Sequence, residues 1–184
     1  ETELLVSLAL RERPREEAWQ GLDLGTGGGA IAVPLACERP LSQVTGIDIS
    51  EDALAVAREN ARAHAPGNVE IMQGSWVTPV RDRTFDIVVS NPPYVAESDS
   101  ALQDLQHEPA QALEAGAEGL DAISVLATDC RDVLVAGGLL LLEHGAEQGD
   151  RVASLLEAAG WTDIQGHDDL AGLTRVTAAR RGGK

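Results

Sequence analysis

Short apolar runs alternate with amphipathic stretches along most of this 184-residue chain. Apolar runs bounded by glycine, proline or polar residues are typical of buried strands, whereas apolar positions three and four residues apart are typical of helices. The pattern predicts strands at residues 22–24, 44–49, 69–72, 85–90 and 139–143, helices at residues 4–12, 30–37, 51–61, 120–134 and 148–159, and a closing hairpin at 162–167 and 174–178.

Strands that alternate with helices need crossover connections, which favour parallel pairing with helices on both faces. The sequence therefore predicts an α/β fold: a doubly wound, mainly parallel sheet that ends in a C-terminal antiparallel hairpin. Ser50, followed by Glu51 and Asp52, is the expected N-cap of one helix. The length suits a single domain over residues 1–184.

Composition narrows the classes of function. Lys and Arg number 14 against 30 Asp and Glu, a net charge of −16, which disfavours direct nucleic-acid binding. Cys37 and Cys130 lack metal or redox spacing, so we interpret both as small buried hydrophobic residues of a cytosolic protein. The most apolar stretch, residues 133–142, is too short to span a membrane. The four histidines form no metal-spaced set, so no metal is predicted.

A glycine-rich turn, Gly25-Thr26-Gly27-Gly28-Gly29, lies between a predicted strand and a helix. Glycines in such a turn permit positive φ angles and close approach of a ligand to the backbone, although the same cluster also suits a plain turn. Asp48 ends the next strand, where an acidic side chain commonly accepts hydrogen bonds from ribose hydroxyls. Its alternative role is to cap the helix that begins near Ser50.

The tetrapeptide Asn91-Pro92-Pro93-Tyr94 follows the predicted strand 85–90. Two prolines stop the strand abruptly, because neither has an N–H group for the sheet ladder. The residue before a proline is pushed toward extended geometry, so Asn91 and nearby carbonyls are expected to act as outward acceptors for a substrate NH2 group. The alternative is that Asn-Pro-Pro forms only a tight turn.

The alternating Gly25, Gly27 and Gly29, with Asp23 before them, resemble the first motif of S-adenosylmethionine-dependent methyltransferases, whereas a nicotinamide enzyme would show Gly-x-Gly-x-x-Gly. Over nearly the whole chain, the order of motifs resembles the glutamine methyltransferases of peptide-chain release factors. Asn-Pro-Pro-Tyr alone is shared with enzymes that methylate exocyclic amino groups of bases. The segments that carry the narrower resemblance are 1–3, 23–32, 46–48, 74–76, 90–94, 108–109, 137–138 and 143–148.

This resemblance implies a Rossmann-like class I fold, S-adenosyl-L-methionine as cofactor and release factors as protein substrates. It also implies an N-terminal helical domain, upstream of this chain. From the acidic charge and the short apolar stretches we expect no direct nucleic-acid or membrane partner. Carried onto this sequence, the cofactor contacts are Gly25, Thr26, Gly27, Gly28, Gly29, Asp48, Trp76 and Asn91, the acceptor glutamine is held by Asn91, Pro92, Pro93 and Tyr94, and the catalytic residues are Asn91, Pro92 and Tyr94.

Three positions carry alternatives or departures. Trp76 is expected either to flank the adenine or to pack under a loop. The pair Glu108-Pro109 either borders the acceptor pocket or forms a simple turn, while Glu143 is expected to be structural rather than a general base. Gly28 stands where relatives usually carry Ser or Thr, from which we expect altered loop flexibility and retained binding.

Four other functions compete with glutamine methylation of release factors. The first is methylation of adenine or guanine amino groups in RNA or DNA, with Tyr94 stacked on a flipped base. The second is methylation of a glutamine in a ribosomal protein. A cofactor-binding module without catalysis and a nicotinamide oxidoreductase are the third and fourth, disfavoured respectively by the intact Asn-Pro-Pro-Tyr and by the glycine spacing.

Overall fold

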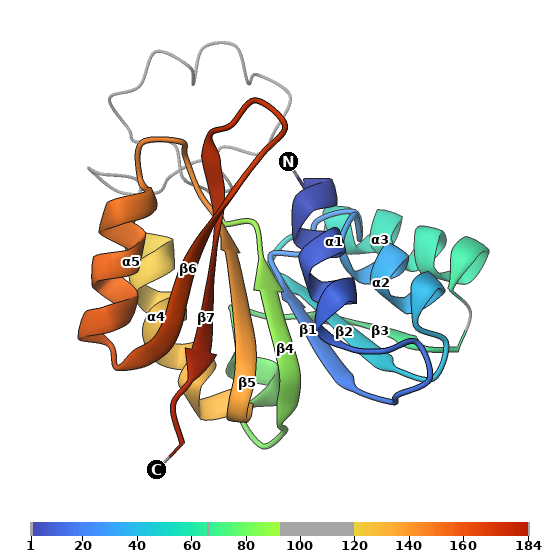
Figure 1. The fold of residues 1–184 in the computed structure, drawn as a ribbon. Coiled ribbons are helices and arrows are strands. Elements are labelled where there is room, and N and C mark those ends of the chain that lie inside the picture. The colour runs from blue at the N-terminus through green and yellow to red at the C-terminus, as the bar shows by residue number, and fades with distance from the viewer. Residues whose placement is uncertain (1, 66, 93–119, 184) are drawn as a thin grey trace.

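The computed structural model describes residues 2–65, 67–92 and 120–183. None of the helices within these ranges is long and apolar enough to cross a membrane. In chain order (Figure 1), the elements are α1 Thr2–Glu12, β1 Gln20–Leu24, α2 Ala32–Glu38, β2 Gln43–Asp48, α3 Glu51–His64, β3 Val69–Gln73, the short 3-10 helix Thr78–Val80, β4 Phe85–Ser90, α4 Asp121–Val133, β5 Leu134–Glu143, α5 Gly149–Ala158, β6 Trp161–Asp168 and β7 Thr174–Arg181.

The strands form one seven-stranded sheet in the order β3-β2-β1-β4-β5-β7-β6. The first five strands pair in parallel, whereas β7 pairs antiparallel with both β5 and β6. The predicted doubly wound α/β fold with a closing hairpin is therefore confirmed. Because the order reverses beside β1, the carboxyl ends of β1 and β4 meet at the point where such sheets bind ligands.

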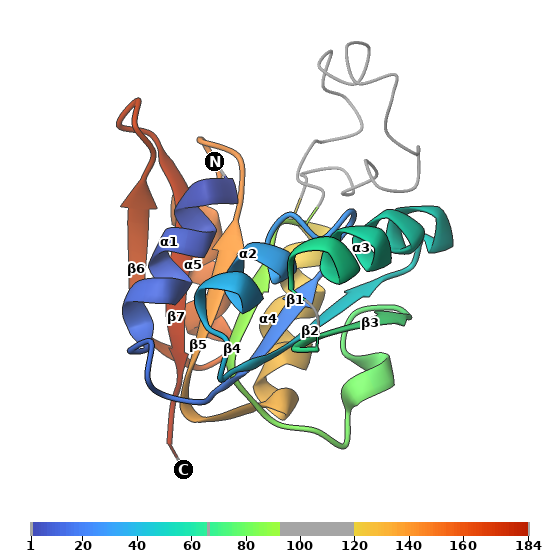
Figure 2. The same ribbon diagram turned by 90° about the vertical axis from the view of Figure 1, so that its right-hand side faces the viewer.

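Alternating side chains divide the core into two layers, one on each face of the sheet. In β4, Val88 packs with the α4 and α5 side chains, whereas Ile87 and Val89 pack with those of α1 and α2. In β5, Leu140 lies in the first layer and Leu141 in the second. Figure 2 shows α1, α2 and α3 in front of the sheet and α4 behind it. Both faces are covered, as the uninterrupted apolar runs predict.

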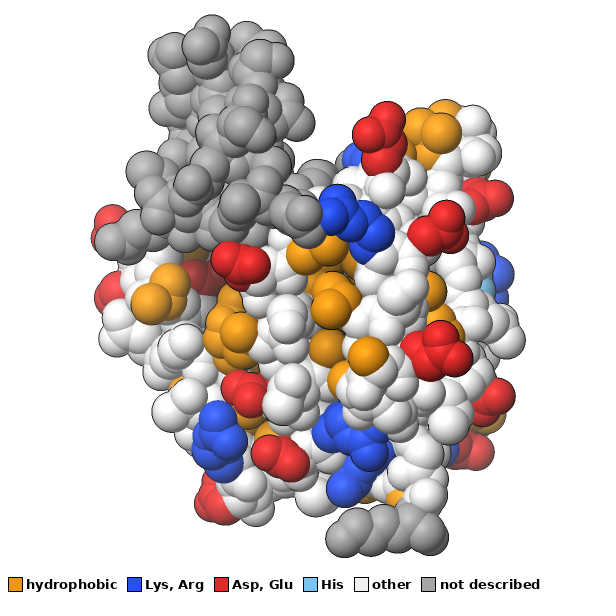
Figure 3. Space-filling view, turned by 90° about the vertical axis from the view of Figure 1, so that its left-hand side faces the viewer, with side chains coloured by type: hydrophobic (Ala, Val, Ile, Leu, Met, Phe, Trp, Pro, Cys, Tyr) orange, Lys and Arg blue, Asp and Glu red, His pale blue; other side chains and the backbone are white. Residues whose placement is uncertain are grey.

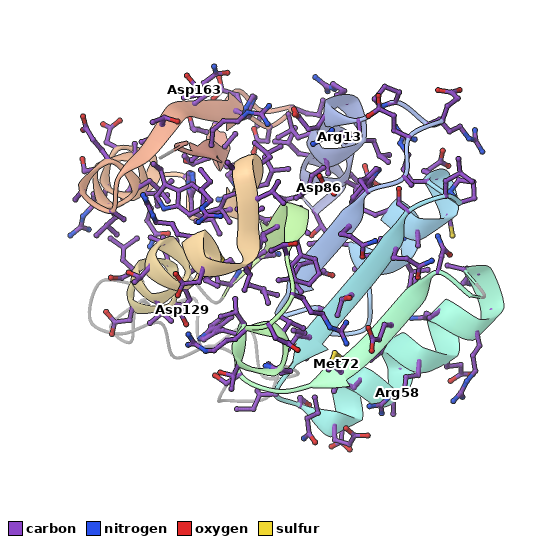
Figure 4. All side chains as sticks on the ribbon, turned by 90° about the horizontal axis from the view of Figure 1, so that it is seen from below. Arg13, Arg58, Met72, Asp86, Asp129 and Asp163 are labelled. Atoms are coloured by element: carbon purple, nitrogen blue, oxygen red, sulfur yellow. The ribbon has the colours of Figure 1, made fainter. Side chains whose placement is uncertain are left out.

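Polar contacts fix α1 and the start of β1 at the amino edge of the sheet. Asp86 of β4 accepts hydrogen bonds from the backbone N–H of Gln20, at 2.9 Å, and from Arg13 Nη2, at 3.3 Å. Figure 4, viewed from below, shows Arg13 and Asp86 side by side. These charges lie at the edge opposite the glycine-rich turn, so they contribute to assembly of the fold.

The start of β5 differs from the sequence-based expectation. We expected a helix to residue 134, a glycine connection and a strand from Leu139, but the strand begins at Leu134. The register with β4 shifts between Phe85↔Leu134 and Ile87↔Leu139, and Gly137 has φ 76°. A bulge absorbs the extra residues, and a glycine lets the backbone turn there at little steric cost. The glycine pair therefore lies inside the strand.

Cys130 is buried as expected, but the interpretation of Cys37 as buried was wrong. The sheet-facing side of α2 is formed by Ala32, Val33, Leu35 and Ala36, which places Cys37 on the outer side. Its Sγ donates a hydrogen bond to the His64 carbonyl at 3.2 Å. Apolar composition alone could not distinguish the two cysteines, because helix orientation decides which one is covered.

Candidate functional site

The glycine-rich loop leaves the carboxyl end of β1 and enters α2. Its alternate glycines Gly25, Gly27 and Gly29 have φ angles of 72°, 52° and 85°, a region that other residues rarely adopt. The backbone N–H groups of Gly25 and Thr26 both donate to the Ile47 carbonyl, at 2.9 and 3.0 Å. The loop is therefore bent back over the end of β2, and the alternating spacing seen in the sequence has a conformational cause.

Asp23 is a buried carboxylate beneath this loop. Its Oδ2 accepts hydrogen bonds from the Thr26 hydroxyl at 2.7 Å and the Ala32 N–H at 3.0 Å. Its Oδ1 is buried and has no hydrogen-bond partner among the described residues. Burial, and to a smaller extent nearby Asp48, raises the pKa of Asp23 to about 6, against the lowering effect of the two hydrogen bonds. Asp23 was not predicted as a site residue from the sequence, although an acidic residue inside an apolar strand was the available signal.

Asp48 ties the loop to the start of α3. Its Oδ2 accepts from the Gly27 N–H at 2.8 Å, and its Oδ1 accepts from the Ser50 N–H at 2.9 Å. Ser50 in turn caps α3 by accepting from the Ala53 N–H, which confirms the predicted N-cap. Asp48 is half-buried, and a carboxylate can accept about four hydrogen bonds, so it retains capacity for a ligand. Asp48 therefore has a structural role next to the N-cap Ser50, and its role as a ligand for the cofactor stays a prediction.

Trp76 and Asn91 converge on Gly25 from two other strand ends. A Cβ atom placed on Gly25 would lie 3.9 Å from Trp76 Cζ3 and 4.0 Å from the Asn91 carbonyl oxygen. Trp76 itself has φ 46° and packs partly against the core. The buried Ser90 hydroxyl donates to the Leu24 carbonyl at 2.7 Å, which fixes the end of β4 against β1. Three segments distant in sequence therefore meet at one point.

The remaining predicted residues fall into four groups. Thr26 is buried, and its hydroxyl is engaged by Asp23. Gly28 differs from its neighbours: its φ is not positive, and a Cβ atom there would lie 3.5 Å from Val56 Cγ1, an ordinary contact. Pro92 is buried and Asn91 half-buried. Predictions for Pro93, Tyr94 and the pair Glu108-Pro109 lie outside the described residues.

One exposed apolar residue beside the site, Ile49, was not predicted from the sequence. Ile49 was assigned to the second strand, but the strand ends at Asp48 and Ile49 is 64% exposed. Its carbonyl accepts a hydrogen bond from Gln73 Nε2 at 3.2 Å. The side chain therefore offers an apolar surface next to Asp48. An apolar residue directly after an acidic strand end was the signal, but it looked like one more strand position.

A separate hollow of about 270 Å³ lies between α1 and the β5-β7-β6 part of the sheet, and its lining includes Leu8, Arg11, Leu141, His167 and Arg180. It contains no residue of the glycine-rich loop. Within the described ranges, no group of three or more His, Cys, Asp or Glu side chains could hold a metal ion. The candidate site is thus the convergence of Asp23, the glycine-rich loop, Asp48, Trp76 and Asn91, and it offers carboxylates and backbone groups rather than a metal cage.

Residues 2–142 match the profile of the methyltransferase small domain. The chain belongs to this methyltransferase family. The match contains every element that builds the candidate site, from α1 to β5. Solved structures with similar folds agree with this assignment of fold: a methyltransferase from Pyrococcus furiosus has a TM-score of 0.72 at 18% identity, covering 98% of this chain and 81% of that chain. A 16S rRNA N2 methyltransferase from T. thermophilus, solved with AdoMet and guanosine, has a TM-score of 0.73 at 20% identity, covering 98% of this chain and 42% of that chain.

Curated relatives within this methyltransferase family carry a narrower name. The chain is 42% identical to the release factor glutamine methyltransferase of Coxiella burnetii, over 99% of this chain and 66% of that protein. It is 46% identical to the protein of the same name from Vibrio cholerae, over 96% of this chain and 63% of that protein. The resemblance drawn from the motifs is therefore confirmed. The chain spans slightly less than two thirds of the length of these relatives.

Proposed function

We propose that this chain carries the catalytic domain of a cytoplasmic enzyme that transfers a methyl group from S-adenosyl-L-methionine to a glutamine side-chain nitrogen, in the Gly-Gly-Gln motif of peptide-chain release factors. The observation that supports it most strongly is the meeting of the glycine-rich loop, Trp76 and Asn91 at one strand edge, in a chain whose 41–46% identical relatives bear that name. Methyl transfer to an amide requires a cofactor-binding loop close to a group that holds the planar amide in position.

The residues present fit S-adenosyl-L-methionine. The buried Asp23 Oδ1 has no partner among the described residues, and an ammonium group such as that of the cofactor's amino-acid part would satisfy it. No atom lies within 4 Å of a Cβ atom placed on Gly27, so this part of the loop faces open space. Asp48 retains acceptors for ribose hydroxyls, and the exposed Ile49 and the Trp76 ring offer apolar surface for adenine. These assignments give each part of the cofactor a chemically matched residue.

The acceptor platform would be the end of β4. An amide nitrogen is a poor nucleophile, because its lone pair is delocalised into the carbonyl. If the Asn91 side-chain oxygen and the Pro92 carbonyl accept hydrogen bonds from the two N–H groups of the glutamine amide, the nitrogen lone pair is turned toward the methyl group and the growing positive charge meets fixed dipoles. Tyr94 would restrict rotation of the glutamine side chain. When bound, the cofactor supplies the electrophilic methyl group.

A rigid strand end suits this role, since a platform that moved would lose its positioning effect. The Ser90–Leu24 hydrogen bond is buried and lies immediately before Asn91. This bond fixes the position of Asn91 relative to β1, the strand that also carries the cofactor loop. The acceptor platform and the cofactor loop would therefore keep a constant separation and orientation. No strong base is required, because the nitrogen becomes acidic as it is methylated and its proton then passes to water.

The test is mass spectrometry of a purified release factor incubated with this chain and S-adenosyl-L-methionine, with structured RNA in a parallel reaction. We expect one methyl group on the glutamine of the Gly-Gly-Gln motif and none on RNA. Methylated RNA in place of protein would support the nucleobase alternative, which the net charge of −16 disfavours. Cofactor binding without transfer to either substrate would contradict catalysis by this chain.

A further inference from the structure

The tip of the β6–β7 hairpin presents two leucines to solvent. Leu170 is 109% exposed and Leu173 50% exposed, so neither contributes to the core. Single exposed leucines are common on protein surfaces, but two within the seven residues 168–174 of this tip form a compact apolar cluster. The tip projects beyond the carboxyl edge of the sheet at the end of β6 and β7 (Figures 1 and 2), and apolar atoms appear there at the top right of Figure 3.

Hydrogen bonds hold the tip in one conformation. Asp169 Oδ1 accepts from the Ala171 N–H at 2.8 Å and the Leu173 N–H at 3.0 Å, while the Asp169 N–H donates to the Leu173 carbonyl at 2.8 Å. Gly172 turns the chain at φ 78°. The Arg175 Nε atom lies 3.9 Å from Asp169 Oδ2. Because the backbone is already ordered, contact with a partner would cost little additional conformational entropy.

The register of the sheet locates the tip relative to Asn91. Ser90 pairs with Leu142, which pairs with Thr177, so these three residues are level across β4, β5 and β7. Leu173 precedes Thr177 by four residues along the strand direction that leaves the sheet. It therefore lies on the order of 15 Å outside the carboxyl edge of the sheet and two strands away from β4. A protein domain of about 100 residues is roughly 30 Å across. A domain that presents a glutamine at Asn91 would therefore extend over the tip.

We propose that the β6–β7 hairpin tip is a docking element for the protein substrate, with Leu170 and Leu173 inserted into an apolar depression on the release factor. This inference rests on the proposed function. The tip, residues 168–174, carries two acidic residues and no basic residue, so it suits an apolar depression with a basic rim and does not suit a nucleic-acid backbone. Backbone hydrogen bonds from Leu173 and Ala171 lower the pKa of Asp169, so the acidic rim stays ionised at neutral pH.

The test compares Leu170→Ser and the double variant Leu170→Ser/Leu173→Ser with a matched control, Leu41→Ser. Leu41 is 58% exposed but precedes β2, at the opposite edge of the sheet. Binding of a fluorescently labelled release factor is titrated with each protein, and methyl transfer is measured on the release factor and on a short peptide that contains Gly-Gly-Gln. All substituted side chains are exposed, so circular dichroism should show an unchanged fold.

We expect the hairpin variants to bind the release factor about tenfold more weakly, with kcat unchanged and with unchanged kinetics on the peptide, while Leu41→Ser behaves as the wild type. Hairpin variants that bind the release factor as tightly as Leu41→Ser would overturn the docking proposal even if the wild type is active. Wild-type protein that binds the release factor but transfers no methyl group would refute the proposed function alone. Absence of any binding by the wild type would refute both.

Discussion

Asp23→Asn should stabilise the ligand-free protein while weakening cofactor binding. The wild-type carboxylate is fully buried, with only Oδ2 hydrogen-bonded. Asparagine has nearly the same shape: its amide oxygen can accept from Thr26 and Ala32, and its NH2 group takes the position of Oδ1. The substitution therefore removes the cost of burying a charge and keeps the packing of the loop.

The magnitude follows from the pKa of Asp23. The folded-state pKa of about 6 lies above the ordinary value of 3.8, so the folded protein holds this proton more tightly than the unfolded chain. Protonation therefore stabilises the fold at low pH, and this stabilisation is lost as the pH rises through about 6. Relative to full protonation at low pH, the titration of Asp23 lowers the free energy of unfolding by about 3 kcal/mol at pH 8 and by about 1.6 kcal/mol at pH 5. The advantage of Asp23→Asn should thus shrink by about 1.4 kcal/mol between pH 8 and pH 5.

Urea unfolding of both proteins at pH 5 and pH 8 measures this difference. Other titrating groups, including the buried His144, whose pKa is lowered mainly by desolvation, act in both proteins and cancel in the comparison. A second measurement, the rise in melting temperature with S-adenosyl-L-methionine, should be smaller for the variant because a neutral amide attracts an ammonium group less strongly. A pH-independent difference, or a variant less stable at pH 8, would refute the assignment of a raised pKa to Asp23.

Three further predictions concern the loop and the platform. Asp48→Ala should weaken cofactor binding by about ten- to a hundredfold, measured by calorimetry, because a ribose acceptor and the anchor of the Gly27 N–H are both lost; unchanged affinity would remove Asp48 from the site. Gly28→Ala should stabilise the protein by about 0.4–1 kcal/mol in urea unfolding, because its φ and surroundings admit a Cβ atom. The matched Gly29→Ala should destabilise it, because φ is 85° and the Cβ would lie 3.1 Å from Val33 Cγ2; equal effects of the two substitutions would contradict this account of the loop. Asn91→Ala should lower kcat on the release factor about 100-fold with little change in cofactor affinity, and normal turnover would exclude Asn91 as the platform.

Much of the fold was predictable, because burial on both faces leaves a strong local signal. The strand at Phe85–Ser90 was predicted with its correct bounds, and the predicted N-cap at Ser50 is present. The predicted start of β5 was wrong, because the strand begins at Leu134. The glycine pair looks like a turn in the sequence, but the strand continues through it with a bulge. Sequence alone contains the glycines but not the partner strand that keeps them in the sheet.

For the candidate site, the sequence determined which chemical groups exist and at which strand ends they lie. The alternating glycines predicted the loop, and the proline pair predicted that β4 ends just before Asn91. Both are local effects, because glycine permits positive φ angles and proline restricts φ whatever surrounds them. Only the tertiary structure decided that Gly25 meets Trp76 and Asn91, and that Asp23 is buried with one oxygen lacking a described partner. Burial, pKa and convergence depend on neighbours brought in by the crossover connections of the sheet, which no local pattern encodes.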